Sequence, residues 1–383
     1  MDRIYLDHAA TTPVRPEVLE AMLPYFGERG YNASSLHAEG RAARAALDDA
    51  RDTVARLLGA KRKEIVFTGS GSEADNLALI GVAQRRKDRG RHIVSTTIEH
   101  HAVLHALDAL RADGFEVTLL PVTAAGEVSP AAFAAALRPD TILASVMYAN
   151  NEIGTVAPVA ELAGIARERG VLFHTDAVQA PGYLPIEVGP LGVDLLSISA
   201  HKFYGPKGVG ALYVRDGVGL EPLVRGGNQE FGRRAGTENV AGIVGMARAL
   251  ELALTGWEAQ AADIAARRDR LEAALAAAIP GLVVNGAGAT RLPNNLSIAV
   301  PGVDSEQLLV RLDLEGVAVS AGSACASGAM EISHVVEAIG LGPTLSASVL
   351  RLSLGRATDD RAATRVAELL PRLVQEMRPN YSC

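Results

Sequence analysis

A lysine directly after an apolar run is the residue of this chain with the most specific chemical potential. Lys202 lies in the glycine-rich segment Ser199–Gly210, just after the run Val193–Ile198, which reads as a buried strand. An ammonium group is seldom fully buried unless it has a use. One use is a covalent Schiff base to pyridoxal phosphate (PLP), whose ring then takes up electrons. A solvated lysine at a strand end is the alternative, and this segment alone leaves both open.

Two further segments could hold the phosphate and the ring of such a cofactor. Thr68–Asn76 joins an expected strand to a helix and contains Gly71 and Ser72. Small residues let the backbone approach an anion, and a helix N-terminus offers free N–H groups. Asp176 ends another expected strand, where ligands gather in open α/β sheets, and its carboxylate could keep a pyridinium nitrogen protonated. The alternatives are an ordinary glycine turn and a helix cap.

Polar residues after two more strands could act on a substrate. His100 could stack on a ring or move a proton near neutral pH. It is adjacent to His101, but consecutive residues on a helix point in different directions, and no Cys/His spacing typical of zinc accompanies them. Asn150 and Asn151 could donate to an anionic oxygen or simply form a turn.

The C-terminal third supplies a candidate nucleophile and a candidate carboxylate-binding group. Cys325 lies among small residues from Ser320 to Ala329. Such a segment is typical of a mobile, accessible loop, and a thiolate acts as a nucleophile only where it can reach a substrate. A buried cysteine packed among small residues is the alternative. Arg351 could bind a carboxylate with two hydrogen bonds or form a surface salt bridge.

Composition limits the kind of protein that carries these residues. A chain of 383 residues, 48% hydrophobic and 21% charged, indicates a globular protein of two domains. The net charge of −7 argues against broad binding to nucleic acid or to an anionic membrane. No apolar span approaches the length of a membrane helix, and the N-terminus lacks the apolar part of a signal peptide. The two cysteines, Cys325 and Cys383, indicate no disulfide framework and favour a reducing cytoplasm.

The elements that must position these residues follow from the apolar pattern. Short apolar runs alternate with amphipathic stretches from about residue 16 to about 250, which predicts a mostly parallel sheet covered on both faces. The expected strands are 65–68, 91–95, 141–146, 171–174 and 193–198, and the expected helices are 76–87, 101–113 and 158–169, with a further helix starting at Ser129-Pro130. A helix over 256–279 leads to a second domain with hairpin-like strands at 296–300 and 317–320 and helices at 305–314 and 359–377. The basic clusters 85–87 and 267–270 are expected on solvated helix faces.

In this order, the segments resemble the cysteine desulfurases, PLP enzymes of fold type I in aminotransferase class V, and more closely the group I branch (NifS/IscS type). The resemblance covers nearly the whole chain, from Tyr5–Thr12 through Asn32–His37 and Arg233–Thr237 to the segments of Cys325 and Arg351. Ser323-Ala324-Cys325 is the most specific marker, because related aminotransferases lack a nucleophilic cysteine there. The chain departs from the family pattern at His8, where Asn is frequent, and at Ala33, where Pro is usual.

The resemblance implies an α/β fold with two domains and a PLP site. The large domain would be 14–255, with a mostly parallel seven-stranded sheet flanked by helices, and the smaller α+β domain would be 1–13 and 256–383, carrying the cysteine loop. Lys202 would hold PLP as a Schiff base, Asp176 would pair with the pyridine nitrogen, Gln179 would contact the ring hydroxyl, and His100 would stack on the ring and transfer protons. The phosphate would be held by Gly71, Ser72, Ser199 and His201.

The remaining implied roles concern the substrate and a second subunit. Thr237 would reach the phosphate of the neighbouring subunit in a homodimer. Asn151, also beside the cofactor, and Arg351 would bind the substrate carboxylate. Cys325 would accept the sulfur, and it could transiently ligate an iron–sulfur cluster, whereas no other metal is expected.

The implied activity is removal of sulfur from L-cysteine, which gives L-alanine and a persulfide on Cys325. The sulfur would pass to acceptors such as iron–sulfur cluster assembly or tRNA thiolation, and the sequence does not name the acceptor. A sulfur acceptor or iron–sulfur scaffold protein is an expected partner, although the chain ends at Cys383 without the extended tail that grips a scaffold in some members. No direct nucleic-acid or membrane partner is expected. The alternatives are a selenocysteine lyase, a class V aminotransferase or a non-catalytic scaffold for sulfur transfer.

Overall fold

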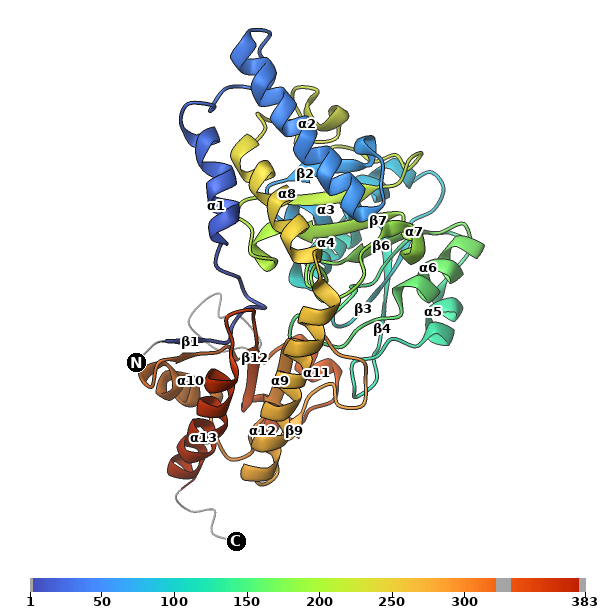
Figure 1. Cartoon of the computed structure of the whole chain (residues 1–383). Coiled ribbons are helices and arrows are strands. Elements are labelled where there is room, and N and C mark those ends of the chain that lie inside the picture. Colours follow the sequence, from blue (N-terminus) through green and yellow to red (C-terminus); the bar gives the residue numbers. More distant parts are fainter. Residues whose placement is uncertain (1–2, 322–331, 379–383) are drawn as a thin grey trace.

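A large and a small structural unit make up the chain. The structure, a computed structural model, describes residues 3–321 and 332–378, so Cys325 and Cys383 lie outside the described residues. Figure 1 shows the large unit above the small one, with the long helix α9 (Trp257–Ala278) descending from the first into the second. Strand β1 (Ile4–Tyr5) and helix α13 (Asp360–Met377) both belong to the lower unit, so the first and the last element of the chain lie in the same unit.

The large unit is built on a seven-stranded sheet that is parallel except at one strand. Its strand order is β2 (Ile65–Thr68), β8 (Gly210–Val214), β7 (Leu195–Ser199), β6 (Leu172–Asp176), β5 (Thr141–Ser145), β3 (His92–Thr96) and β4 (Glu116–Leu120). Strand β8 runs antiparallel to both of its neighbours, and the remaining pairs are parallel. This arrangement confirms the expected mostly parallel seven-stranded sheet.

Helices cover both faces of this sheet because its strands are apolar on both sides. Successive strand side chains point to opposite faces, so Phe67 and Val66 enter different hydrophobic cores. The core of Phe67 includes side chains of α1 (Pro16–Met22), α2 (Ala38–Leu58), α5 (Pro130–Ala136), α6 (Val159–Glu168), α7 (Val188–Leu191) and α8 (Val240–Leu254). The core of Val66 includes side chains of α3 (Gly71–Arg86) and α4 (His101–Ala112).

Two boundaries differ from the sequence prediction in ways that matter for function. Helix α3 begins at Gly71 and not near residue 76, because the Ser70 hydroxyl accepts a hydrogen bond from the N–H of Glu73 (3.1 Å) and caps the helix. The polar first turn concealed this start, since it lacks the apolar periodicity of the rest. Strand β6 continues two residues beyond the expected end, which makes Asp176 its last residue.

The small unit has its own core and two small sheets. An antiparallel sheet has the order β12 (Val349–Ser353), β10 (Asn295–Ala299) and β9 (Val283–Val284), and β1 pairs in parallel with β11 (Val317–Ala318). Its core joins Leu6 to side chains of α9, α10 (Ser305–Leu314), α13, β10 and β12. Short helices α11 (His334–Ala338) and α12 (Pro343–Ser346) precede β12.

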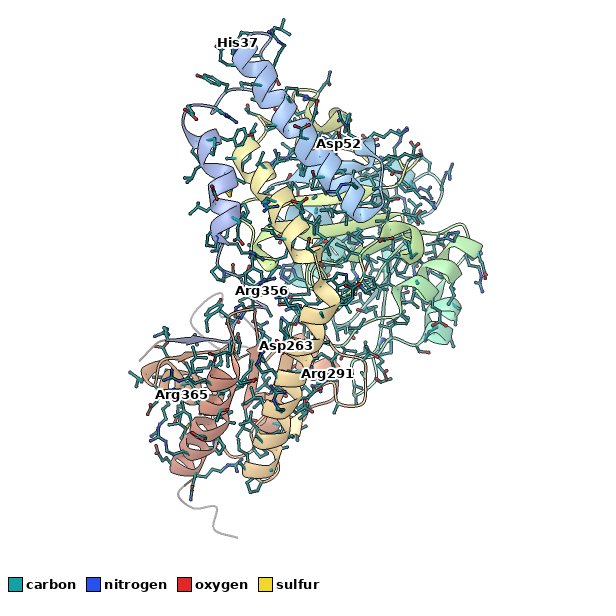
Figure 2. The ribbon with its side chains drawn as sticks, in the orientation of Figure 1. His37, Asp52, Asp263, Arg291, Arg356 and Arg365 are labelled. Atoms are coloured by element: carbon teal, nitrogen blue, oxygen red, sulfur yellow. The ribbon has the colours of Figure 1, made fainter. Side chains whose placement is uncertain are left out.

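Two further expectations for the C-terminal third are wrong. Strands β10 and β11 do not form a hairpin, because α10 separates them and a hairpin needs a short turn. Arg268 does not lie on a solvated face; it is buried and donates from Nη1 to the carbonyl oxygens of Leu292 and Asn295, both at 3.0 Å. Figure 2 shows Arg356 at the junction of the two units and Asp263 on α9 below it.

No single helix among residues 3–321 and 332–378 combines the length and apolarity that crossing a bilayer requires. One bent pair, α8 with α9 at an angle of 71°, has the length and the composition for such a crossing, and this match rests on length and composition alone.

Candidate active site

A cavity of about 400 Å³ lies at the carboxyl ends of the sheet strands, where the two units meet. This size falls in the range of ligand pockets, about 300–1,000 Å³. The cavity is lined by ten of the residues predicted to bind cofactor or substrate: Gly71, Ser72, His100, Asn151, Asp176, Gln179, Ser199, His201, Lys202 and Arg351. Thr237 is exposed and does not line it, and Cys325 lies outside the described residues.

A second cavity, of about 880 Å³, is larger but has a different lining. It runs along the N-terminal segment and the start of α13, and none of the predicted site residues lines it. Volume therefore does not identify the site in this protein; the convergence of ionisable side chains does.

Lys202 is held at the cavity by backbone carbonyl groups. It ends the short turn η3 (Ala200–Lys202) after β7, and its Nζ donates to the carbonyl oxygens of Ala9 (2.6 Å) and Ala10 (2.8 Å). Burial, with a smaller effect of the Arg351 guanidinium, lowers the pKa of Lys202 to about 8, although the Asp176 carboxylate opposes this shift. A lysine with such a pKa has a substantial neutral, nucleophilic fraction near neutral pH.

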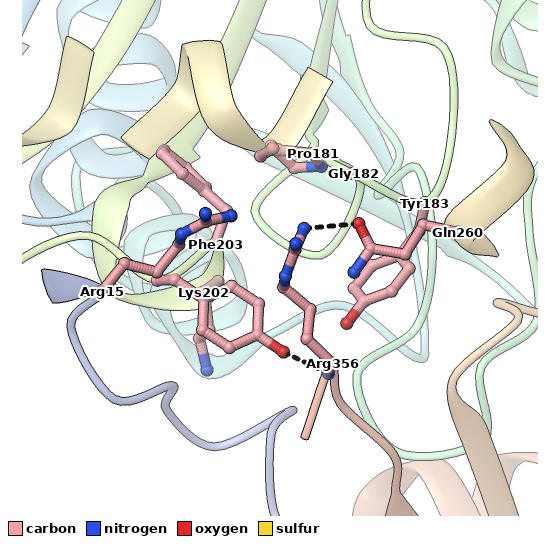
Figure 3. Close-up of a pocket in the computed structure, with 10 residues that line it drawn as sticks. Arg15, Pro181, Gly182, Tyr183, Lys202, Phe203, Gln260 and Arg356 are labelled. Atoms are coloured by element: carbon pink, nitrogen blue, oxygen red, sulfur yellow. Dashed lines mark hydrogen bonds between the residues drawn. The ribbon is translucent and has the colours of Figure 1, made fainter. Parts of the chain in front are cut away.

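The backbone just after Lys202 is anchored by the N-terminal segment and the small unit. Tyr204 has a φ of 66°, a left-handed conformation that is uncommon for a tyrosine. Its N–H donates to the Thr12 hydroxyl (2.6 Å), and its own hydroxyl accepts from the backbone N–H of Arg356 (2.9 Å). Figure 3 shows the surroundings of Lys202, where Arg356 contacts Gln260 and the Lys202 amine points away from both. The N-terminal segment and the small unit thus fix the position of Lys202.

Asp176 faces the same cavity from the end of β6. It is buried, and its Oδ1 accepts from the backbone N–H of Val178 at 2.9 Å. Burial raises the pKa of Asp176, whereas the nearby His100 and Lys202 act to lower it. A cationic N–H donor at this carboxylate would favour its charged form further.

Two buried carboxyl groups that were not singled out from the sequence lie near Asp176. Burial, followed by the charge of Asp176, raises the pKa of Asp75 well above its ordinary value, and burial raises the pKa of Glu99 to about 8. Asp75 Oδ1 and Glu99 Oε2 are buried without a hydrogen-bond partner among the described residues. The raised pKa values favour the protonated, neutral form of Asp75 and Glu99, whereas His100 and Lys202 favour the charged form of Asp176. Asp75 was visible in the sequence within Thr68–Asn76, and Glu99 precedes His100, but no pattern revealed that both are buried.

A neutral histidine of β6 lies beside Asp75. His174 contacts the hydroxyl of Ser145 through Nδ1 (2.8 Å) and that of Ser197 through Nε2 (3.0 Å), and its Nε2 lies 3.6 Å from Asp75 Oδ1. Burial lowers the pKa of His174 to about 3, so this ring carries no charge at neutral pH. Hydroxyl groups thus contact both nitrogens of the His174 ring, and the ring adds no charge under the cavity.

The N-terminus of α3 forms an anion-binding end of the cavity. The first N–H groups of a helix have no partner within the helix, and here Gly71 and Ser72 bring them to the cavity wall. A Cβ atom at Gly71 would lie 2.8 Å from Val178 Cγ2 and 3.2 Å from Ser199 Cβ, so the position requires glycine. Burial lowers the pKa of His201 to about 4, which leaves its ring neutral, and its Nδ1 lies 3.1 Å from the Thr11 hydroxyl.

His100 caps helix α4 at the cavity wall. Its Nδ1 accepts a hydrogen bond from the backbone N–H of Ala102 at 3.1 Å. Burial lowers the pKa of His100, so the ring is neutral at neutral pH, and with Nδ1 accepting it carries its proton on Nε2. Among the described residues, no three His, Cys, Asp or Glu side chains are placed to hold a metal ion.

Arg351, on β12, presents an incompletely satisfied guanidinium to the cavity. Its Nη1 donates to the carbonyl oxygen of Asn151 (2.9 Å) and its Nη2 to Asp7 Oδ1 (2.8 Å), while the buried Nε has no partner among the described residues. An unpaired buried N–H is costly, so this group is suited to a ligand carboxylate. Asn150 has a structural role instead: its amide donates to the Ile98 carbonyl and its oxygen accepts two backbone N–H groups.

The chain on either side of residues 322–331 lies at the cavity. Before them, Ser320 lines the cavity and pairs with Arg351 through two backbone hydrogen bonds (2.7 and 3.2 Å). After them, His334 lines the cavity and contacts the Glu99 carbonyl through Nε2 (2.9 Å), and the Ser333 hydroxyl donates to Glu152 (2.6 Å). Both flanks of the segment that contains Cys325 are therefore anchored beside the predicted site.

Comparison with known proteins gives consistent matches along the chain. The family model of aminotransferase class-V matches residues 4–366. A protein named cysteine desulfurase IscS from Dictyoglomus turgidum is 48% identical over 375 residues, which are 98% of this chain and 95% of that protein. One of the same name from Methanosarcina thermophila is also 48% identical, with 98% and 93% covered.

Solved structures with the same fold were also found. A NifS-like protein superposes with a TM-score of 0.92 at 36% identity, covering 98% of this chain and 100% of that one. The structure described as SspA in complex with cysteine has a TM-score of 0.81 at 35% identity, with 92% and 98% covered.

Proposed function

Because this chain belongs to the aminotransferase class-V family, whose desulfurase members depend on PLP, we propose that it is a cysteine desulfurase. It takes the sulfur atom of L-cysteine, releases L-alanine and carries the sulfur as a persulfide on Cys325. The observation that carries this assignment is the single cavity in which a lysine of lowered pKa, the buried Asp176 and the incompletely paired Arg351 converge. A lysine that can bind PLP and an arginine that can bind a carboxylate together favour an amino acid as the substrate.

The cavity fits PLP at each of its ends. Lys202 Nζ would hold the cofactor covalently, the Asp176 carboxylate would accept from its ring nitrogen, and Gln179 would contact its ring hydroxyl. Its phosphate would lie at the N-terminus of α3, within reach of Ser199 and His201. When bound there, PLP supplies an electron sink for charge that develops on the substrate's α-carbon.

The chain's own groups bind the substrate and move its protons. Arg351, positioned by Asn151 and Asp7, binds the substrate carboxylate and so fixes the direction of the α-carbon. The neutral amine of Lys202 removes the α-proton at Nζ and returns it later. His100 assists proton transfer, for which Nδ1 must first release the N–H of Ala102.

Cys325 completes the reaction as the sulfur acceptor. Its thiolate attacks the substrate sulfur; a sulfur–sulfur bond forms, the carbon–sulfur bond breaks, and the departing carbon keeps the electron pair and takes up a proton. L-cysteine and the enzyme thiol thereby become L-alanine and an enzyme persulfide, with no external oxidant or reductant. The position of Ser320 and His334 at the cavity supports this role.

A homodimer is part of the proposal. Large apolar side chains are exposed on α1 and the chain that follows it, and more are exposed just before Thr237: Leu19, Leu23, Phe26, Leu36, Leu223, Val224 and Phe231. Since Thr237 is exposed away from its own cavity, it would serve the phosphate of the neighbouring subunit. The two units would act as domains of residues 14–255 and of 1–13 with 256–383.

The cellular role is proposed at the level of reaction class. The persulfide passes its sulfur to an acceptor protein in the cytoplasm, for iron–sulfur cluster assembly or tRNA thiolation. The relatives' name IscS supports iron–sulfur cluster assembly as the destination of the sulfur.

Product analysis tests the activity. The PLP-loaded protein with L-cysteine and a thiol reductant should form alanine and sulfide in equal amounts, and Cys325→Ser should abolish both. Alanine formation that survives Cys325→Ser would favour a lyase that acts without this thiol. Consumption of a keto acid would favour an aminotransferase, and a protein that takes up no PLP would favour a non-catalytic scaffold.

A further inference from the structure

Glu73, in the first turn of α3, binds two separate segments with one carboxylate. Its Oε2 accepts from the backbone N–H of Gly69 at 2.7 Å. Gly69 begins the segment 69–72, which contains the proposed phosphate ligands Gly71 and Ser72 and which we call the phosphate loop. Its Oε1 accepts from Arg234 Nε at 2.7 Å, and Arg234 Nη2 lies 3.3 Å from Oε2. A Cβ atom at Gly69 would lie 2.8 Å from Glu73 Oε2, so a larger residue there would displace the carboxylate. The carboxylate therefore joins the phosphate loop to the segment of Arg234.

The segment of Arg234 is also held at its other end, by a buried ion pair. Arg51 donates from Nη1 and Nη2 to the two carboxylate oxygens of Glu230 (2.7 and 2.6 Å), and both side chains are buried. Glu230 also accepts from the backbone N–H of Phe67 (2.8 Å). Glu230 and Phe231 have φ values of 49° and 58°, so two consecutive non-glycine residues are left-handed. Such strain persists only where the surroundings enforce it.

These two attachments present Thr237 to the exterior of the subunit. Outside these two attachments, the N–H of Gly236 donates to the side-chain oxygen of Gln229 (3.2 Å), which closes the segment on itself. Thr237 follows three residues after Arg234 and is exposed. The segment 229–237, which we call the arm, is thus shaped by contacts within one subunit.

We propose that Glu73 is a positioning residue for two cofactor sites at once. It holds the phosphate loop of its own subunit through Gly69 and, through Arg234, holds the arm that delivers Thr237 to the neighbouring subunit. This inference rests on the proposed homodimer. The Glu73 and Arg234 side chains are 23% and 25% exposed, so solvent screens their attraction only in part.

A substitution in the arm of one subunit should therefore affect PLP binding in the other subunit. Loss of the Arg234 side chain frees the arm but leaves the bond from Gly69 to Glu73 intact. It should therefore weaken PLP binding in the neighbouring subunit and spare the site of the altered subunit. A defect of folding or of local packing would instead act first on the subunit that carries it.

Mixed dimers separate these outcomes. In each dimer one subunit carries Lys202→Ala, so the visible absorbance of lysine-bound PLP reports on a single site. When Arg234→Ala is on the Lys202→Ala subunit, the PLP dissociation constant at the intact site should rise by about fivefold or more, a typical coupling between sites. When Arg234→Ala is on the subunit with Lys202, that constant should not change.

Controls make both outcomes decisive. Arg233→Ala removes the adjacent arginine, which donates to the Lys63 carbonyl (2.9 Å) and not to Glu73, and should change the constant less than Arg234→Ala does. Arg234→Lys should restore part of the affinity. The inference is overturned if PLP affinity falls only at the site of the subunit that carries Arg234→Ala. It is also overturned if Arg233→Ala lowers PLP affinity as much as Arg234→Ala does. Sedimentation of the wild-type protein as a monomer would instead overturn the proposed homodimer.

Discussion

Arg351 donates a hydrogen bond from Nη2 to Asp7 at 2.8 Å, and this contact joins the N-terminal segment to β12 at the wall of the cavity. Nη1 is engaged by the Asn151 carbonyl, and the buried Nε has no partner among the described residues. The guanidinium is therefore oriented in advance, while its Nε–H remains unpaired among the described residues. Preorganisation of this kind favours recognition of a carboxylate in one direction.

Arg351→Lys should raise the KM for L-cysteine far more than it lowers kcat. A lysine offers a point charge in place of the planar donor fork, and the loss of a charged hydrogen bond corresponds to roughly tenfold to a hundredfold in affinity. Steady-state kinetics measure both constants. Arg356→Lys is the control, because Arg356 contacts Gln260 away from the cavity. An unchanged KM for Arg351→Lys would contradict the assigned role.

The rate at which the apoprotein captures PLP should follow the titration of Lys202. Only the neutral amine attacks an aldehyde, and the pKa of Lys202 is lowered to about 8. The second-order rate constant should therefore rise between about pH 7 and about pH 9 and then level off. Stopped-flow absorbance measures it. A rate that keeps rising to about pH 10 would show a lysine with an ordinary pKa.

The two aspartates near the cofactor site should respond differently to the same substitution. Burial raises the pKa of Asp75 well above its ordinary value, so Asp75→Asn, which introduces a neutral amide of similar shape, should change PLP affinity and turnover little. Asp176→Asn removes the charge that faces the ring nitrogen and should lower turnover by about a hundredfold or more, the scale of lost preorganised electrostatic stabilisation. PLP titration and alanine formation give both readouts. Equal losses in the two variants would show that Asp75 is charged.

His100→Ala should slow persulfide formation within a single turnover. The pKa of His100 is lowered, so its ring is neutral and able to exchange a proton near neutral pH. The defect should be about tenfold to a hundredfold or more, as for other positioned acid–base groups. Rapid-quench detection of alanine measures the step. His101→Ala, which alters the adjacent ring, serves as the comparison, and an unchanged rate for His100→Ala would exclude the role.

The positions of the predicted site residues at strand ends could be read from the sequence because a parallel sheet brings those ends together. Asp176 and Lys202 each follow an apolar run, and such runs predict strands without a structure. Asp176 ends β6, and Lys202 follows the end of β7, so the topology brings both to one cavity.

Other features depend on long-range packing that periodicity does not report. The raised pKa values of Asp75 and Glu99 follow from burial by elements far apart in sequence. The same holds for Asp7, which meets Arg351 only because β1 joins the small unit. The burial of Arg268 was predicted wrongly for this reason, since its partners are carbonyl groups beyond the end of its helix.

Mass spectrometry of the peptide that contains Cys325 tests the central claim most directly. After brief exposure of the PLP-loaded protein to L-cysteine, this peptide should carry one additional sulfur atom that a thiol reductant removes. The same peptide from Lys202→Ala, treated identically, should carry none. Alanine release without any added sulfur on Cys325 would contradict the account, because the sulfur would then leave by a route that this thiol does not serve.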